Sequence, residues 1–193
     1  MDPYPEGQAA MMPEVIDIAT IFGPVHLIWT RSQSGPKVRR IVLPHDLPTS
    51  VAAFEDAPPD GELPDDSIRA LIAGIRSFLQ GNDVRFDIDL LDLDRCPLFQ
   101  RRVLLAEFGI PRGYVSTYGR IARHLDTPGA ARAVGNALAR NPFPLVIPCH
   151  RVLRSDGRIG GFQAGLAMKR RLLEMEGVGF REDGRAIMER IWY

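Results

Sequence analysis

Cysteine is scarce in this sequence, and its scarcity limits the structural chemistry available to the chain. Only Cys96 and Cys149 occur among 193 residues, and neither belongs to a CxxC pair or to a Cys/His cluster with metal-ligand spacing. A disulfide framework needs several cysteines, and a structural zinc site needs clustered Cys and His ligands. The sequence therefore predicts neither kind of site, and we expect both thiols to be reduced.

Long apolar runs are missing as well. No segment approaches the roughly 18 consecutive apolar residues of a membrane-spanning helix, and the acidic, proline-containing start MDPYPEG lacks the basic and apolar regions of a signal peptide. The chain also has no internal repeat and no low-complexity tract. With 45% apolar residues, it is typical of a globular protein of one or two small domains. We therefore expect a cytoplasmic protein that does not bind membranes.

The net charge is zero, but the two halves of the chain differ strongly. Residues 1–96 carry 8 Lys and Arg against 16 Asp and Glu, a net charge of −8, whereas residues 97–181 carry 14 against 5, a net charge of +9. Such asymmetry is typical of an acidic half joined to a half that meets a polyanion. Uneven surface charge on an ordinary globular protein explains the same numbers, so charge alone does not decide between them.

The first half of the chain predicts strands followed by a helix. Extended segments rich in β-branched residues run from Val15 to Pro44, with turn residues at Gly23-Pro24 and Ser34-Gly35-Pro36, which predicts an antiparallel meander. Apolar residues then recur at helical spacing from Asp65 to Leu79, and Gly81-Asn82 ends this pattern.

The residues that follow this helix lead to the second half. Apolar residues stand at every second position from Val84 to Leu90, which predicts a half-buried strand. The acidic stretch from Asp87 to Asp94 predicts a connection between two domains. We therefore place a first domain at residues 1–96, a second at 97–181, and a tail at 182–193 whose apolar residues we expect to dock on the body.

The second half predicts short helices separated by glycine and proline. One helix is expected at Leu98–Phe108, and a second, short one at Ser116–Leu125. Thr127-Pro128 supply an N-cap and a proline at the first helical position, which opens a third helix that runs to about Arg140. Two short helices joined by a tight turn, in a basic domain, resemble a helix-turn-helix.

One short segment joins stiff apolar residues to two reactive side chains. Residues 141–152 read NPFPLVIPCHRV, and the three prolines with the Leu-Val-Ile run predict an extended, buried approach to Cys149 and His150. A reactive cysteine needs a partner that favours its thiolate, because the thiolate is the nucleophile. Neighbours on an extended strand point to opposite faces, so His150 would reach the sulfur through a bend or a water. Taken alone, a packed thiol beside a polar histidine is the simpler interpretation.

Five motifs in the second half resemble one protein family in order and spacing. They are VSTYGRIA at 115–122, ARAVGNAL at 131–138, PCHRV at 148–152, GGF at 160–162 and GLAMKRRLLEMEG at 165–177. The pattern is similar to that of the O6-alkylguanine-DNA alkyltransferase family, and looser similarity extends from Phe99 to Gly177. The resemblance implies an α+β fold, in which a small ribonuclease-H-like mixed domain with an antiparallel sheet precedes a mainly helical DNA-binding domain with a helix-turn-helix.

The resemblance also implies catalytic roles for three residues. Cys149 matches the cysteine that accepts the alkyl group, His150 the group that deprotonates it through a water, and Glu176 the glutamate that orients this histidine. Glu176 lies at the edge of an apolar helical stripe, so its carboxylate can face inward and pair with His150. The alternative is a solvated carboxylate, because a negative charge in the last turn opposes the helix dipole.

Further matches imply residues that bind DNA and extrude the damaged base. Arg132 matches the arginine that takes the place of the extruded base, on a helix face where Ala131 and Gly135 are small enough for close approach to DNA. Tyr118 matches the tyrosine that helps rotate the nucleotide outward, and Asn141 the asparagine that joins this helix to the active-site segment. The respective alternatives are one exposed arginine among many, a core aromatic and an ordinary helix stop.

Two weaker candidates and two departures complete the comparison with the family. Ser116 and Arg151 are candidates for contacts to DNA phosphates, although such side chains on basic surfaces often touch only water. Leu104 stands where many relatives have tryptophan, and Cys96-Pro97 replaces a more usual glycine-containing entry to the first helix. These departures affect packing and the domain junction more than the chemistry.

The implied function is direct repair of alkylated double-stranded DNA. Cys149 would take the alkyl group from O6-alkylguanine, with O4-alkylthymine as a further candidate substrate, irreversibly and without a metal or other cofactor. Each molecule would act once, as a monomer. Two other functions stay open. A lesion-binding protein would flag damage without repairing it, which the presence of Cys149 disfavours. A Cys-His hydrolase would turn over repeatedly and ignore DNA, which the helix-turn-helix pattern and Arg132 disfavour.

Overall fold

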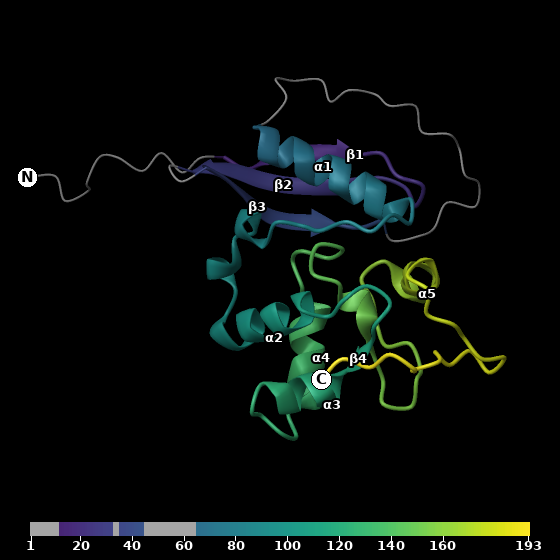
Figure 1. The fold of residues 1–193 in the computed structure, drawn as a ribbon. Coiled ribbons are helices and arrows are strands. Elements are labelled where there is room, and N and C mark those ends of the chain that lie inside the picture. The colour runs from purple at the N-terminus through teal and green to yellow at the C-terminus, as the bar shows by residue number, and fades with distance from the viewer. Residues whose placement is uncertain (1–11, 33–34, 45–64) are drawn as a thin grey trace, which may run out of the picture.

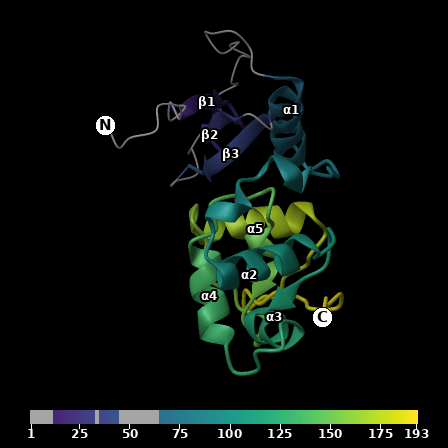
Figure 2. The ribbon, with the colours of Figure 1, turned by 90° about the vertical axis from the view of Figure 1, so that its left-hand side faces the viewer.

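The computed structural model describes residues 12–32, 35–44 and 65–193. These residues form a three-stranded antiparallel sheet, five α-helices and several shorter elements. The sheet lies at one end of the molecule and most of the helices lie at the other (Figures 1 and 2). The expected α+β fold, with antiparallel strands in the first half, is confirmed at this level. In the described ranges, no helix has the length and apolar character needed to cross a membrane.

The sheet has the meander topology that the sequence predicts. Its strands are β1 (Glu14–Ile18), β2 (Val25–Ser32) and β3 (Gly35–Val42). They pair in that order, each antiparallel to the next. Gly35 begins β3 with φ +107°, a conformation that side chains disfavour, which explains the glycine in the second expected turn. Ser34 of that turn lies outside the described residues.

Helix α1 (Asp66–Leu79) covers one face of the sheet (Figure 1). It begins where the sequence predicts, because the carboxylate of Asp65 accepts a hydrogen bond from the N–H of Ser67 and so caps the helix. The apolar residues at helical spacing are buried against the sheet, and Gly81 follows the end of the helix with φ +97°.

The expected strand at Val84–Leu90 is wrong. The residues that follow α1 are irregular, and they lead into two 3-10 turns, η1 (Ile88–Leu90) and η2 (Leu93–Arg95). The carboxylate of Asp87 accepts a hydrogen bond from the N–H of Asp89 at 2.9 Å. This local bond starts the first turn and gives the backbone an alternative to strand pairing.

The second half is mainly helical. Its elements are α2 (Leu98–Phe108), β4 (Ser116–Thr117), α3 (Tyr118–His124), α4 (Ala131–Ala139), η3 (Cys149–Arg151), β5 (Val152–Leu153) and α5 (Gly165–Met175). The bounds of α2 are those predicted. The short strands β4 and β5 pair in parallel, which brings the start of α3 beside the segment that follows Cys149.

Helix α4 begins later than expected, and the prediction of an N-cap at Thr127 is wrong. The hydroxyl of Thr127 donates to the carbonyl of Ala122. Gly129 then takes φ +90°, outside the helical region, so the helix starts only at Ala131. The short helices α3 and α4 nevertheless pack against each other across this turn.

The last residues of the chain pack against the helical half. The N–H of Val115 donates to the carbonyl of Arg190, and the N–H of Trp192 donates to the carbonyl of Val115. The phenol of Tyr193 donates to the carbonyl of Ala106 in α2 at 2.7 Å. The expectation that the tail docks on the body is therefore confirmed.

One apolar core runs through both halves. Its buried side chains come from the sheet and α1 as well as from α2, α3, α4 and α5. The N–H of Ile41 in β3 donates to the carbonyl of Pro142, and the ring of Phe78 in α1 lies 5.8 Å from the ring of His150. The first half therefore covers the back of the segment that carries Cys149.

Candidate active site

The segment that leads to Cys149 is a buried turn. The sequence predicts an extended approach over residues 141–148, and this prediction is wrong. The N–H of Ile147 donates to the carbonyl of Phe143, and Leu145 takes φ +74°. The prolines make the segment stiff, but they fold it back on itself before it enters the 3-10 turn η3. Cys149 and its neighbour are therefore consecutive residues of a tight turn rather than of a strand.

Asn141 closes this turn from inside the protein. Its side chain is fully buried; Oδ1 accepts a hydrogen bond from the N–H of Phe143 at 2.9 Å, and Nδ2 donates to the carbonyl of Ile147 at 3.1 Å. Both ends of the turn are thus tied to one side chain. Asn141 joins the end of α4 to the segment with Cys149, at the position for which the sequence singles it out.

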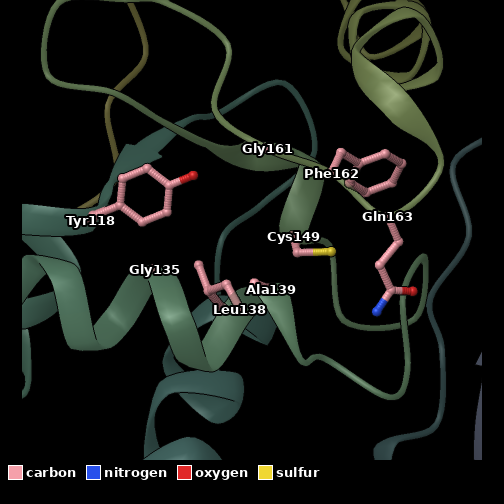
Figure 3. A pocket seen from close by; sticks show the side chains of 8 residues that line it. All are labelled: Tyr118, Gly135, Leu138, Ala139, Cys149, Gly161, Phe162 and Gln163. Carbon is pink, nitrogen blue, oxygen red and sulfur yellow. The ribbon is translucent and has the colours of Figure 1, made fainter.

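Cys149 lies at a cavity of about 300 Å³. The sulfur is between Tyr118 on one side and Phe162 and Gln163 on the other (Figure 3). The cavity is also lined by Gly135, Leu138, Ala139 and Gly161. Helices α3 and α4 and the loop before α5 therefore all contribute to its walls, and 7% of the Cys149 surface remains exposed.

Glycine is needed where the loop before α5 passes Tyr118. A Cβ atom on Gly160 would lie 2.2 Å from the phenolic oxygen of Tyr118, closer than any real contact. A Cβ atom on Gly135 of α4 would be in ordinary contact with the same ring, at 3.7 Å. Of these glycines, Gly160 of the GGF motif is thus the one that leaves room for Tyr118 at the cavity.

His150 and Glu176 form a buried pair behind Cys149. Nε2 of His150 lies 2.9 Å from Oε1 of Glu176, and both side chains are almost completely buried. Gly177 follows with φ +87°, and its N–H and that of Val178 bond the carbonyls of Glu174 and Leu173, which ends α5 in a Schellman motif. This ending fixes the backbone position of Glu176.

Arg151 completes the charged group. Its Nε donates to Oε2 of Glu176 at 2.8 Å, and its NH2 group donates to Oε1 at 2.7 Å. Burial alone would raise the pKa of Glu176, but His150 and Arg151 lower it to about 2. Glu176 is therefore a carboxylate at neutral pH and accepts the Nε2 proton of His150.

The remaining ring nitrogen of His150 is then a free acceptor. Burial lowers the pKa of His150, although Glu176 opposes this effect, so the ring is neutral. Because Nε2 carries the proton shared with Glu176, Nδ1 has the lone pair. Nδ1 is buried and forms no hydrogen bond with the residues that the structure describes. The turn thus presents a neutral base next to the cysteine.

Cys149 itself is a neutral thiol at rest. Burial raises its pKa to about 12; the carboxylate of Glu107 acts in the same direction, and a hydrogen bond with Asn141 and the charge of Lys169 act against it. A thiol with this pKa needs a base and a positive charge to become a nucleophile.

Three of the expected DNA-binding residues lie on α4, which forms one wall of the cavity. Arg132 is exposed on α4, and Ala131 and Gly135 of the same helix are partly exposed, while the apolar side of α4 is buried. Gly135 and Tyr118 also line the cavity. The structure therefore brings the small-residue face of α4 beside Cys149, with Arg132 in solvent.

Ser116 and Arg151, the two candidates for phosphate contacts, have partners within the protein. Ser116 is fully buried, and its hydroxyl donates to the carbonyl of Trp192. Arg151 is bound to Glu176 and donates to the carbonyl of Ile110 at 2.6 Å. Both side chains are thus engaged within the protein in this conformation, and their contact with DNA phosphates stays a prediction.

The sequence interpretation missed Glu107 and Lys169. Both are fully buried near Cys149, Glu107 on α2 and Lys169 on α5. Helical spacing indicates that each is buried, because residues three or four positions apart lie on the same helix face. Glu107 follows the buried Val103 and Leu104 by four and three residues. Lys169 likewise precedes buried leucines by three and four.

Comparison with known proteins identifies related sequences. Residues 98–178 match the family described as 6-O-methylguanine DNA methyltransferase, DNA binding domain. The methylated-DNA–protein-cysteine methyltransferase of Methanothermobacter thermautotrophicus is 53% identical over 112 residues, which are 58% of this chain and 62% of that protein. The protein of the same name from Mycobacterium leprae is 41% identical over 118 residues, 60% of this chain and 70% of that protein.

Solved structures of relatives have the same fold over most of the chain. The crystal structure of Mycobacterium tuberculosis OGT in complex with DNA has a TM-score of 0.66 and 32% identity, covering 84% of this chain and 92% of that one. The O6-methylguanine-DNA methyltransferase of Pyrococcus kodakaraensis has a TM-score of 0.59 and 26% identity, covering 86% and 100%. The chain belongs to the O6-methylguanine DNA methyltransferase family.

Proposed function

We propose that this chain transfers an alkyl group from O6-alkylguanine in double-stranded DNA to the sulfur of Cys149. The observation that carries the proposal is the position of Cys149: it lies at a cavity lined by Tyr118 and Phe162, with the buried His150–Glu176 pair behind it. Aromatic rings can hold a flat purine in such a cavity. Relatives named methylated-DNA–protein-cysteine methyltransferase support the same chemistry.

The reaction is a direct displacement. The thiolate of Cys149 attacks the alkyl carbon, an S–C bond forms, and the bond between that carbon and O6 breaks. The thiol proton passes to Nδ1 of His150 through a water, Glu176 stabilises the charged imidazole, and guanine leaves with the electron pair and takes up a proton. The thioether is stable, so each molecule acts once. No metal or other cofactor takes part in these steps.

The DNA is held by the second half of the chain. We propose that α3, the turn and α4 act as a helix-turn-helix, with Ala131 and Gly135 against the minor groove. Arg132 enters the base stack in place of the extruded guanine, and Tyr118 crowds its phosphate so that the nucleotide rotates into the cavity. The crystal structure of the M. tuberculosis relative with DNA supports DNA binding.

The proposed repair of DNA also suggests roles for the parts of the chain, an oligomeric state and a location in the cell. We propose that residues 1–96 form a ribonuclease-H-like domain that supports the active-site segment. Residues 97–181 carry repair, and residues 182–193 extend that part. A repair protein that acts once needs no partner subunit and works where the DNA is, so we propose a monomer in the cytoplasm.

Restoration of guanine in DNA tests the proposed activity. A duplex with one O6-methylguanine, in excess over the protein, is digested to nucleosides and its guanine lesion is quantified. We expect the wild type to remove one lesion per protein molecule and then stop. Cys149→Ala should remove none, whereas Cys96→Ala, which changes the half-buried second thiol, should match the wild type. Continued removal beyond one equivalent, or removal by Cys149→Ala, would contradict the proposal.

A further inference from the structure

Arg112 holds the ends of two helices, a role that the proposed reaction does not use. Its Nη1 donates to the carbonyl of Asn82 at 2.9 Å, and its Nη2 donates to the carbonyls of Gly81 at 2.6 Å and Met175 at 2.7 Å. Gly81 and Asn82 directly follow the C-cap of α1, and Met175 is the last residue of α5. One partly buried guanidinium group thus joins the C-terminal ends of α1 and α5.

The ends of these helices suit an arginine. Each helix closes in a Schellman motif, which satisfies only some of its last carbonyls. The C-terminal end of a helix also carries partial negative charge and attracts a cation. A guanidinium group has several donors in one plane together with a positive charge, so it can bind carbonyls from both helices at once. Arg112 therefore serves as a shared cap of α1 and α5.

The loop between α2 and β4, which carries Arg112, also contacts the active-site residues. A Cβ atom on Gly113 would lie 3.1 Å from the carbonyl oxygen of Glu176, and Gly113 takes φ +77°, so the loop passes close to the backbone of Glu176. Two residues before Arg112, the carbonyl of Ile110 accepts a hydrogen bond from Arg151 at 2.6 Å. Arg151 in turn binds both carboxylate oxygens of Glu176. The loop therefore contacts Glu176 at its backbone and, through Arg151, at its side chain.

We propose that Arg112 is a positioning residue for the proton relay: by fixing the end of α5 to the end of α1, it holds the carboxylate of Glu176 against Nε2 of His150. One carbonyl that it binds belongs to Met175, the residue directly before Glu176. Because His150 and Glu176 come from different elements, their hydrogen bond of 2.9 Å requires α5 to end at one place beside η3. A displacement of about 0.5 Å would lengthen this bond beyond its normal range.

Helix α1 supports both members of the pair. The ring of Phe78 in α1 lies 5.8 Å from the ring of His150, and Arg112 ties the residues after α1 to the end of α5, where Glu176 lies. The first half of the chain thus takes part in aligning the relay. The proposal rests on the proposed function, in that His150 and Glu176 form the base that activates Cys149.

The test is the reactivity of Cys149 towards a simple thiol reagent, without DNA. A Cys96→Ala protein serves as the parent, its variants are mixed with dithiodipyridine, and the rate of Cys149 modification is followed from about pH 6 to pH 9. We expect Arg112→Gln to react about tenfold more slowly than the parent over this range. The reason is that Glu176 then no longer keeps its hydrogen bond to His150, which becomes a weaker base.

A double variant separates positioning from a structural role. If Arg112 acts through Glu176, its loss changes nothing once the carboxylate is gone, so Arg112→Gln/Glu176→Gln should react as fast as Glu176→Gln alone. Arg112→Lys keeps the charge at the helix ends but loses the planar fork, and should react about threefold more slowly than the parent. Arg85→Gln removes an exposed arginine that lines the same cavity as Arg112, and should leave the rate unchanged.

Three outcomes would overturn the proposal. The first is an unchanged or faster rate in Arg112→Gln, since the loss of a contact that only stabilises the fold would loosen the protein and expose the buried thiol. The second is a double variant slower than Glu176→Gln by the full factor that Arg112→Gln loses alone. The third is an equal loss in Arg85→Gln. If Arg112→Gln does not fold, Arg112→Lys replaces it in the cycle, and its smaller loss should disappear in the Glu176→Gln background.

The proposed function can fail separately. If Arg112→Gln lowers the reactivity of the thiol as expected but the parent takes no alkyl group from DNA, the positioning role stands and the repair function is wrong. If the parent repairs DNA but Arg112→Gln leaves the thiol rate unchanged, repair stands and the positioning role is wrong.

Discussion

At the scale of single residues, the two ring nitrogens of His150 have different surroundings. Nε2 is held by Glu176, so the ring keeps one tautomer, and Nδ1 is left to accept a proton from the direction of Cys149. Arg151, which the sequence offers as a phosphate contact, supports this arrangement by fixing both oxygens of Glu176. We therefore expect the charge of Glu176 to be central to the proposed proton relay from Cys149 to His150.

Replacing Glu176 with Gln removes that charge and keeps the shape. Burial raises the pKa of this carboxyl, but His150 and Arg151 lower it from 4.5 to about 2. Because the folded-state pKa is depressed, the carboxylate stabilises the fold by about 3 kcal/mol at pH values above the unfolded-state pKa. This contribution is lost as the pH falls towards the folded-state pKa. We expect denaturant unfolding to show that loss at neutral pH and little difference near pH 2.

The same variant should also slow the reaction of Cys149 with a simple thiol reagent. A glutamine cannot stabilise a protonated imidazole, so His150 becomes a weaker base. Glu174→Gln on the exposed side of the same helix serves as the control for both measurements. Unchanged thiol reactivity across pH would remove Glu176 from the relay, even if the protein were destabilised.

At the scale of elements, α4 connects the surface that we propose meets DNA with the cavity of Cys149. One side of the helix packs in the core through Val134 and Leu138, while Gly135 and Ala139 line the cavity of Cys149. Arg132 projects into solvent from the same helix. Contact with DNA along α4 would thus be contact beside Cys149, which suits the base extrusion that we propose for this helix.

Arg132→Ala separates base extrusion from the chemistry. Extrusion costs a few kcal/mol, so loss of the wedge should slow repair of duplex DNA by about 10- to 100-fold. Reaction with free O6-benzylguanine needs no extrusion and should be nearly unchanged. Arg140→Ala, an exposed arginine after the end of the same helix, controls for general loss of positive charge. Equal losses with both substrates would remove the wedge role.

Regular elements could be predicted from the sequence where apolar spacing repeats over several turns, as in α1. The short turns could not, because single local hydrogen bonds decide them. Asp87 starts a 3-10 turn where alternation favours a strand, and the hydroxyl of Thr127 bonds the end of α3 rather than capping α4. Helical spacing could have located the buried Glu107 and Lys169, but not their shared neighbourhood.

The candidate site could be predicted from the sequence only because its motifs occur in the order typical of the family. His150 and Glu176 lie 26 residues apart and meet because α5 ends in a tight cap beside η3. No spacing rule within one element brings them together. The same motifs could not reveal that Ser116 and Arg151 are engaged within the protein, since their partners come from the tail and from α5.

At the scale of the whole molecule, we propose that the first half supports the active site and that the second half carries the chemistry. The acidic first half supplies the sheet and α1, which share a core with the helices and contact the segment that carries Cys149. The basic second half, with a net charge of +9 over residues 97–181, has the surface suited to DNA. Cys149 lies between these two regions, backed by the first half and open towards the surface of the second.

Intact-protein mass spectrometry tests the central claim most directly. The protein is mixed with a duplex that carries one O6-methylguanine, beside a Cys149→Ala control and an unmodified duplex. The account predicts a gain of one methylene mass, saturating at one per protein and located on Cys149, with no gain in either control. An unchanged mass in a protein that binds the damaged duplex would contradict the account and favour a protein that flags lesions.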